Sequence, residues 1–305
     1  MTAAAPAPGP RSEFYRSRGL RVHYLAWPGA AARPVVLVHG VADQAWTWRR
    51  VAEALTPTFS AYALDLPGHG DSIQEGTGLQ SHQAYVADLA NLVAHLGVGS
   101  LVLIAHSMGG TVAMQYAGAF PETVARLVVV DELGPIDVPA MPAPERLRLW
   151  VTRLQELDRR PTRRYGSVDE VAERMRRANG RLSAEQALER ARAGTTVAPD
   201  GSVVVKIDRY AWTTQPEYRL FQFSRAEMEE LWRNISCPVL YVTGTESEWR
   251  NVEYERRAAA LIANLDVRVI EGAGHVVHHE KLAEFLEILL PFLGTAPEGA
   301  ESRDP

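Results

Sequence analysis

The stretch Leu101-Val102-Leu103-Ile104-Ala105-His106-Ser107-Met108-Gly109-Gly110 joins a run of apolar residues directly to the start of a helical pattern. Four apolar residues in succession indicate a strand that is buried on both faces. Ser107 therefore falls on a sharp turn between a strand and a helix. The small residues Ala105 and Gly109 on either side of it allow neighbouring backbone segments to pass closely. A serine in such a turn exposes its hydroxyl beside the free N–H groups of the helix, which is typical of a catalytic nucleophile.

Five other short apolar runs resemble this strand and predict the rest of a sheet. They are residues 35–38, 61–64, 127–130, 239–242 and 267–270. Helical patterns lie between several of them, including one that begins after Ser81 and stops at Gly97, and another over 282–290. Strands that alternate with helices predict an α/β fold with a doubly wound, mostly parallel sheet. Residues 12–30 could add an antiparallel hairpin at one edge of that sheet.

Residues 136–235 interrupt this alternation. Pro135 precedes the region, three more prolines open it, and helical pieces follow at about 145–159, 168–179 and 184–193. Because structureless loops of this length are rare, we expect a mainly helical cap (lid) inserted between two strands. The core then comprises residues 12–135 and 236–294. Residues 1–11 and 295–305 are expected to be flexible tails.

The composition excludes several classes of protein. The chain has 305 residues, 46% of them hydrophobic and 23% charged, which are values of a globular protein. A net charge of −5 argues against nucleic acid as a partner, and no apolar run is long enough to cross a membrane. A single cysteine, Cys237, excludes an internal disulfide, and residues 1–10 lack the features of a signal peptide. We therefore expect a cytoplasmic protein, with its oligomeric state open and a homodimer among the options.

Three further motifs accompany the Ser107 turn in a characteristic order. They are Val38-His39-Gly40, Asp65-Leu66-Pro67-Gly68-His69-Gly70-Asp71-Ser72 and Gly272-Ala273-Gly274-His275. With these motifs the chain resembles the α/β-hydrolase family over nearly its whole length, and in particular its serine hydrolases of esterase or lactonase type with a helical cap. Ala105 departs from the glycine that is usual in the family.

The resemblance implies a set of roles. Ser107 is the expected nucleophile and His275 the expected base. The backbone N–H groups of Val41 and Met108 are expected to form the oxyanion hole. No metal or organic cofactor is implied. Of the other histidines, His39 and His106 are expected to orient backbone rather than to react.

The third member of the triad is less obvious. Most α/β-hydrolases place an acid where this chain has Ser247, which cannot stabilise an imidazolium by charge. Glu248 or Glu246 could substitute if that loop is longer by one residue. A minority of the family places the acid at the end of the strand after the nucleophile helix, which here is Asp131, 24 residues beyond Ser107. We favour Asp131, with Glu248 and the adjacent Glu132 as alternatives.

These residues predict hydrolysis of a carboxylic ester or lactone through an acyl-enzyme intermediate. Trp46, Trp150 and Trp212 are tentative pocket residues, since aromatic walls suit an apolar or ring-containing small molecule. An amide or C–C bond hydrolase and a perhydrolase remain alternatives with the same triad. A ligand-binding receptor that retains the fold without catalysis is a further alternative.

Overall fold

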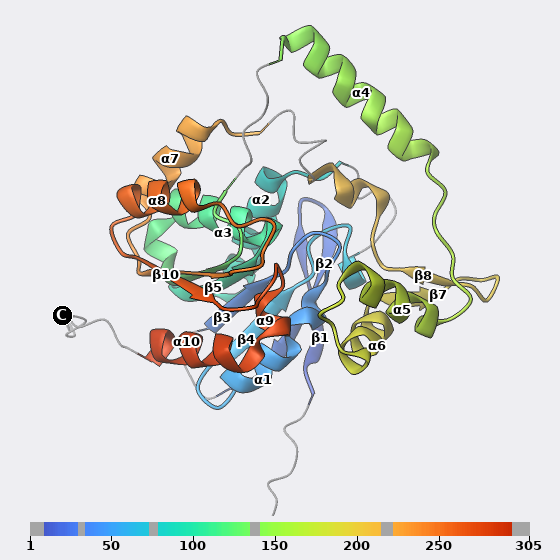
Figure 1. The fold of residues 1–305 in the computed structure, drawn as a ribbon, viewed down its shortest axis with the longest axis horizontal. Coiled ribbons are helices and arrows are strands. Elements are labelled where there is room, and N and C mark those ends of the chain that lie inside the picture. Colours follow the sequence, from blue (N-terminus) through green and yellow to red (C-terminus); the bar gives the residue numbers. More distant parts are fainter. Residues whose placement is uncertain (1–8, 30–33, 73–78, 135–140, 215–221, 295–305) are drawn as a thin grey trace, which may run out of the picture.

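The computed structural model describes residues 9–29, 34–72, 79–134, 141–214 and 222–294, most of which are organised around one sheet (Figure 1). Most of the two expected tails, residues 1–8 and 295–305, therefore lies outside the described residues. Arg11, which was expected to end the first tail, is instead the first residue of a strand. Within the described residues, no helix combines the length and the apolar character needed to cross a membrane.

The sheet has eight strands in the order β1-β2-β4-β3-β5-β6-β9-β10. Their bounds are β1 (Arg11–Ser17), β2 (Leu20–Trp27), β3 (Pro34–Val38), β4 (Ser60–Leu64), β5 (Leu101–His106), β6 (Val124–Val130), β9 (Val239–Gly244) and β10 (Leu265–Ile270). From β4 to β10 neighbouring strands run parallel, whereas the β1–β2 hairpin pairs antiparallel at one edge. The predicted fold class, a mostly parallel α/β sheet, is confirmed.

Both faces of the central strands are buried, as their continuous apolar sequence predicts. In β3, Val36 and Val38 pack in one hydrophobic cluster while Val35 and Leu37 pack in another on the opposite face. The first cluster lies against α2 (His82–Leu96), α3 (Met108–Ala119), α7 (Arg225–Asn234) and α8 (Val252–Leu261). The second lies against α1 (Arg49–Leu55), α9 (Val277–Glu280) and α10 (Leu282–Gly294). Short 3₁₀ turns complete the core at η1 (Ala45–Trp48), η2 (Gly70–Ser72) and η3 (Pro121–Thr123).

Strand β10 departs from the prediction for residues 267–270. It lies at the edge of the sheet, and Val269 is 40% exposed. An edge strand has one neighbour only, so its apolar side chains are covered less completely than those of β5 or β9. The predicted helix ends are confirmed for α2, where the Ser81 hydroxyl accepts a hydrogen bond from the N–H of Ala84 and Gly97 adopts φ +64°.

The region between β6 and β9 contains the three predicted helical pieces. They are α4 (Ala143–Arg159), α5 (Val168–Ala178) and α6 (Ala184–Ala193), followed by the hairpin β7 (Thr195–Val197) and β8 (Val203–Val205) and the turn η4 (Arg209–Thr214). Helices α5 and α6 pack with the hairpin around a small hydrophobic cluster of their own. Figure 1 shows α4 standing away from this α5–α6 unit, and Leu157 is its only buried residue.

Helix α7 falls within the expected cap, 136–235, but it packs on the core. Its Met228 and Trp232 belong to the same hydrophobic cluster as Leu103 of the sheet. Gly118 of α3 allows close approach, because a Cβ added there would lie 2.5 Å from the carbonyl oxygen of Leu231. We therefore assign α7 to the core. The segments 135–140 and 215–221 that flank the insertion lie outside the described residues.

This contact generates a stability prediction. Gly118→Ala should lower the free energy of unfolding by about 1–3 kcal/mol, since overpacking of a close contact forces the two helices apart. Urea denaturation measures the change. Gly99→Ala is the matched control, because nothing lies within 4 Å of the added Cβ and the residue is exposed. Equal stability of the two variants would contradict the assignment of α7 to the core.

Candidate active site

The turn between β5 and α3 holds Ser107 in an unusual backbone conformation, with φ +52° and ψ −126°. Among the described non-glycine residues, only Arg18, Ala42, Ser107 and Asp131 have a positive φ. Such conformations cost of order 1–3 kcal/mol and persist only where the surroundings enforce them. Three of these four residues follow the neighbouring central strands β3, β5 and β6. The strained backbone is therefore concentrated at the carboxyl ends of these strands.

Close backbone packing enforces the conformation of Ser107. A Cβ at Gly109 would lie 2.5 Å from the carbonyl oxygen of His39, so only glycine fits at this position in the first turn of α3. A Cβ at Gly40 would lie 3.1 Å from the Cβ of Ser107. The small residues that the sequence places around Ser107 thus permit the end of β3 and the start of α3 to meet.

The structure brings Ser107, His275 and Asp131 together from three separate segments. The Nε2 atom of His275 lies 2.9 Å from Ser107 Oγ, and its Nδ1 atom lies 2.6 Å from Asp131 Oδ2. Asp131 is fully buried, whereas the side chain of His275 is 23% exposed. The partly exposed side chains of Ser107 and His275 can therefore contact a substrate, while the Asp131 carboxylate is shielded from water.

The alternatives for the acid have other surroundings. Ser247 donates a hydrogen bond from its hydroxyl to Asp131 Oδ2, and Thr243 donates one to Oδ1. Glu248 is exposed, and Glu132 accepts a hydrogen bond from the N–H of Gly134. The residue at the family's usual acid position thus serves Asp131 as a donor. Sequence reasoning missed this role of Ser247 and that of Thr243.

The two candidate oxyanion donors belong to separate segments, Val41 to the loop after β3 and Met108 to the start of α3. Met108 is the first residue of α3, so its N–H has no partner within the helix. Val41 follows Gly40, where an added Cβ would lie 3.1 Å from the Cβ of Ser107. His39 shapes this loop as expected, because its Nε2 accepts a hydrogen bond from the N–H of Leu66 and its Nδ1 donates to the carbonyl of Gly40.

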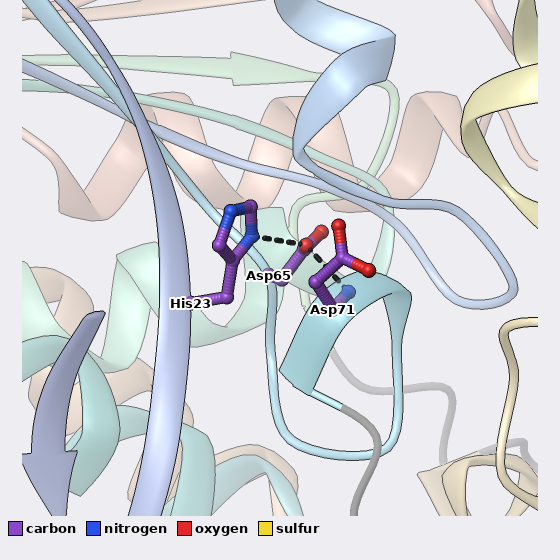
Figure 2. A group of neighbouring side chains, drawn as sticks. All are labelled: His23, Asp65 and Asp71. Atoms are coloured by element: carbon purple, nitrogen blue, oxygen red, sulfur yellow. Dashed lines mark hydrogen bonds and ion pairs between the residues drawn. The ribbon is translucent and has the colours of Figure 1, made fainter. Parts of the chain in front are cut away.

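A buried His–Asp pair anchors the end of the same loop (Figure 2). Asp65 accepts hydrogen bonds from His23 Nδ1 at 2.7 Å, from the N–H of Ala45 at 2.6 Å and from the N–H of Asp71 at 2.9 Å. Burial alone would raise the pKa of Asp65, but the hydrogen bond from His23 and the other donors hold it below its ordinary value. The ionised carboxylate therefore ties η1 to the loop that follows β4.

The spacing of His23, Asp65 and Asp71 also resembles that of metal ligands, since their ligand atoms lie within 4.8 Å of one another. The Asp65 carboxylate is already bound by N–H donors, and Asp71 pairs with Lys206 Nζ at 2.6 Å. A cation there would have to displace these donors. We interpret the group as a hydrogen-bonded anchor.

His106, next to the nucleophile, supports the histidine loop. Its Nε2 donates a hydrogen bond to the carbonyl of His275 at 3.0 Å. Burial, together with the neighbouring His275, holds the pKa of His106 well below its ordinary value. A neutral His106 thus orients backbone, as the sequence predicts, and adds no positive charge beside the imidazole of His275.

The three tryptophans named as tentative pocket residues stay predictions. Trp46 lines a cavity of about 430 Å³ with His23 and Lys206, and neither Ser107 nor His275 lines that cavity. Trp150 lies on α4, and Trp212 is 37% exposed in η4. The ring of Trp249 lies beside His275, with the two ring centroids 5.8 Å apart. The sequence offered no signal for Trp249, because its loop is placed by β9 and β10 together.

Comparison with known proteins agrees with this architecture. The chain is 26% identical to the uncharacterized protein Rv2715 of Mycobacterium tuberculosis, over 94% of this chain and 82% of that protein. It is also 26% identical to the sn-1-specific diacylglycerol lipase ABHD11 of Xenopus laevis, over 86% of this chain and 80% of the lipase. A solved thioesterase domain from the curacin biosynthetic pathway shares the fold, with a TM-score of 0.82 at 24% identity, over 93% of this chain and 100% of the domain. Residues 35–288 match the model of the alpha/beta hydrolase family, and the chain therefore belongs to that family.

Proposed function

We propose that this protein is a serine hydrolase that cleaves a carboxylic ester through an acyl-enzyme intermediate. The observation that supports it best is the unbroken pair of hydrogen bonds from Ser107 Oγ through the imidazole of His275 to Asp131. A hydroxyl, a base and a buried acid in this order form the arrangement that activates a serine.

In the first half of the reaction, the proton of Ser107 Oγ passes to His275 Nε2 as Oγ bonds to the ester carbonyl carbon. The electron pair of the C=O bond moves to the carbonyl oxygen, and the N–H groups of Val41 and Met108 stabilise that oxyanion. Removal of one such donor typically lowers kcat by about 10²–10³. The oxyanion then collapses, the C–O bond of the alcohol breaks, and His275 returns its proton to the departing alkoxide.

In the second half, water takes the place of the alcohol. His275 Nε2 accepts a proton from water as the oxygen attacks the acyl carbon. Collapse of this second oxyanion breaks the bond to Ser107 Oγ, which regains the proton from His275. The products are a carboxylic acid and an alcohol. A lactone would follow the same steps, with both groups remaining in one molecule.

Asp131 keeps the imidazole in the tautomer that has its proton on Nδ1. It also offsets the positive charge that His275 acquires in each transition state. A fully buried carboxylate is costly unless donors surround it, and the hydroxyls of Ser247 and Thr243 are such donors here. Ser247 and Thr243 thereby satisfy both oxygens of the Asp131 carboxylate in a place that water does not reach.

An ester is favoured as the substrate for two reasons. Serine attacks a carbonyl carbon, whereas haloalkane and epoxide opening in this fold depend on an aspartate that forms an alkyl ester. The diacylglycerol lipase to which the chain is similar is named for ester cleavage. Trp249 replaces Trp46 as the aromatic residue that we expect beside the acyl or alcohol group.

Substitution of the nucleophile tests the proposal. Ser107→Ala should abolish turnover of p-nitrophenyl esters and covalent labelling by a fluorophosphonate probe, because no other residue forms the bond to carbon or phosphorus. Mass spectrometry of the labelled protein measures the adduct. Labelling of Ser107→Ala to the extent seen in the wild type would refute the assignment. A wild type that binds esters without releasing products would favour the receptor alternative.

The acid is tested by two amide substitutions. Asp131→Asn should lower kcat by roughly 10⁴, since the histidine loses both its tautomer control and its counter-charge. Glu248→Gln is the matched control and should retain kcat within about tenfold, because the side chain of Glu248 is exposed. Ester hydrolysis gives kcat, and thermal melting shows whether either variant is unfolded. If Glu248→Gln lost its activity and Asp131→Asn kept it, the acid would lie in the loop after β9.

A further inference from the structure

The loop that carries His275 is fixed by a carboxylate outside the triad. Glu280, at the end of α9, accepts a hydrogen bond from the N–H of Gly274 at 2.6 Å on Oε2 and from the N–H of Val276 at 3.4 Å on Oε1. These two amides flank His275 on either side. The side chain of Glu280 is only 3% exposed, so both bonds are sheltered from water.

Two residues of the insertion hold Glu280 in turn. Asn179 Nδ2 donates to Glu280 Oε1 at 3.1 Å, and Arg181 Nε lies 3.6 Å from Oε2. Both residues belong to the turn between α5 and α6. The Asn179 side chain is itself fixed, since its Oδ1 accepts a hydrogen bond from the N–H of Arg181.

Arg181 also contacts the histidine loop directly. Its Nη1 donates to the carbonyl of Gly272 at 3.2 Å, and its Nη2 pairs with Glu246 in the loop after β9. A Cβ at Gly274 would lie 2.9 Å from both Arg181 Nε and Glu280 Oε2, so the two charged groups close over this glycine. The backbone from Gly272 to Val276 is therefore held by groups from two parts of the chain.

We propose that Glu280 is a positioning residue for His275, and that the Asn179–Arg181 turn of the insertion keeps Glu280 in place. This inference rests on the proposed function, because it concerns the histidine of the same site. The α5–α6 unit is then a part of the catalytic framework. Its turn sets the distance between His275 Nε2 and Ser107 Oγ without touching substrate.

The inference predicts a loss of kcat with little change of KM. Glu280→Gln should lower kcat at least tenfold, because the amide offers one acceptor atom where the carboxylate has two. Arg181→Ala should lower kcat about three- to tenfold, since misplacement by less than an ångström slows proton transfer. KM should stay within about twofold in both variants, and the double variant should be no slower than Glu280→Gln alone.

Arg177→Ala is the matched control, because that arginine is 71% exposed and its ion pair is with Glu173 of the same helix. It should leave kcat unchanged. Ester hydrolysis by the full chain gives kcat and KM for every variant, and circular dichroism verifies the fold. Arg181 is 40% exposed, so its truncation tests the inference even where Glu280→Gln is unstable.

Amide hydrogen exchange separates this inference from the proposed function. Exchange at Gly274 and Val276 should accelerate in Glu280→Gln and Arg181→Ala and not in Arg177→Ala, whether or not the protein hydrolyses esters. If the wild type hydrolyses esters but both variants retain its kcat and its exchange rates, the positioning role is wrong. If exchange accelerates in a protein that hydrolyses no ester, the loop contact stands and the proposed function fails.

Discussion

The close approach of two backbone segments at Ser107 is the constraint on which the site depends. The end of β3 and the start of α3 meet where Gly40 and Gly109 lack side chains, and this contact holds Ser107 at φ +52°. The strained conformation costs free energy that the surrounding sheet must supply. The same turn places Ser107 directly before α3, whose first N–H groups have no partner within the helix. The nucleophile and one candidate oxyanion donor therefore arise from a single turn.

Sequence patterns predicted most strands and helices of this framework well, because apolar runs and helix caps are formed by residues that are close together in the sequence. Continuous apolar runs identified β3, β5, β6 and β9, and the serine cap and final glycine located α2. The edge strand β10 was predicted less well, since burial depends on how many neighbours a strand has. Helix α7 was expected in the cap, because its contact with Gly118 joins residues that are far apart in the sequence.

The candidate site was predicted in part. Ser107 and His275 lie in motifs that are short and continuous, so the sequence alone could indicate them. The acid depends on which of two loops reaches the imidazole, and the fold brings Asp131 to it while Ser247 donates to Asp131. Trp249 was not predicted, because only the positions of the surrounding strands bring its ring to His275.

Charge complementarity explains why one part of the insertion lies firmly on the core. Residues 141–214 contain fifteen Lys and Arg against ten Asp and Glu, although the whole chain has a net charge of −5. Most of these arginines are solvated, as the sequence suggests, but Arg190 pairs with the buried Asp43 at 2.9 Å and Arg181 pairs with Glu280. Because Asp43 and Glu280 are sheltered, salt screens these pairs less than it screens surface pairs.

Separation of the α5–α6 unit from the core would leave those carboxylates buried without their partners. The loss of one partner from a buried pair costs about 3–5 kcal/mol, and the Arg190–Asp43 pair, with side chains 17% and 8% exposed, is of this kind. Asp43 lies between the candidate donor Val41 and η1, and Glu280 lies beside the His275 loop. The unit is thus anchored at the loop of one candidate oxyanion donor and at the loop of His275. Helix α4, with Leu157 as its one buried residue, is held differently, since the carbonyl of Asp158 near its end accepts a hydrogen bond from Arg209 Nη1 of η4 at 2.6 Å.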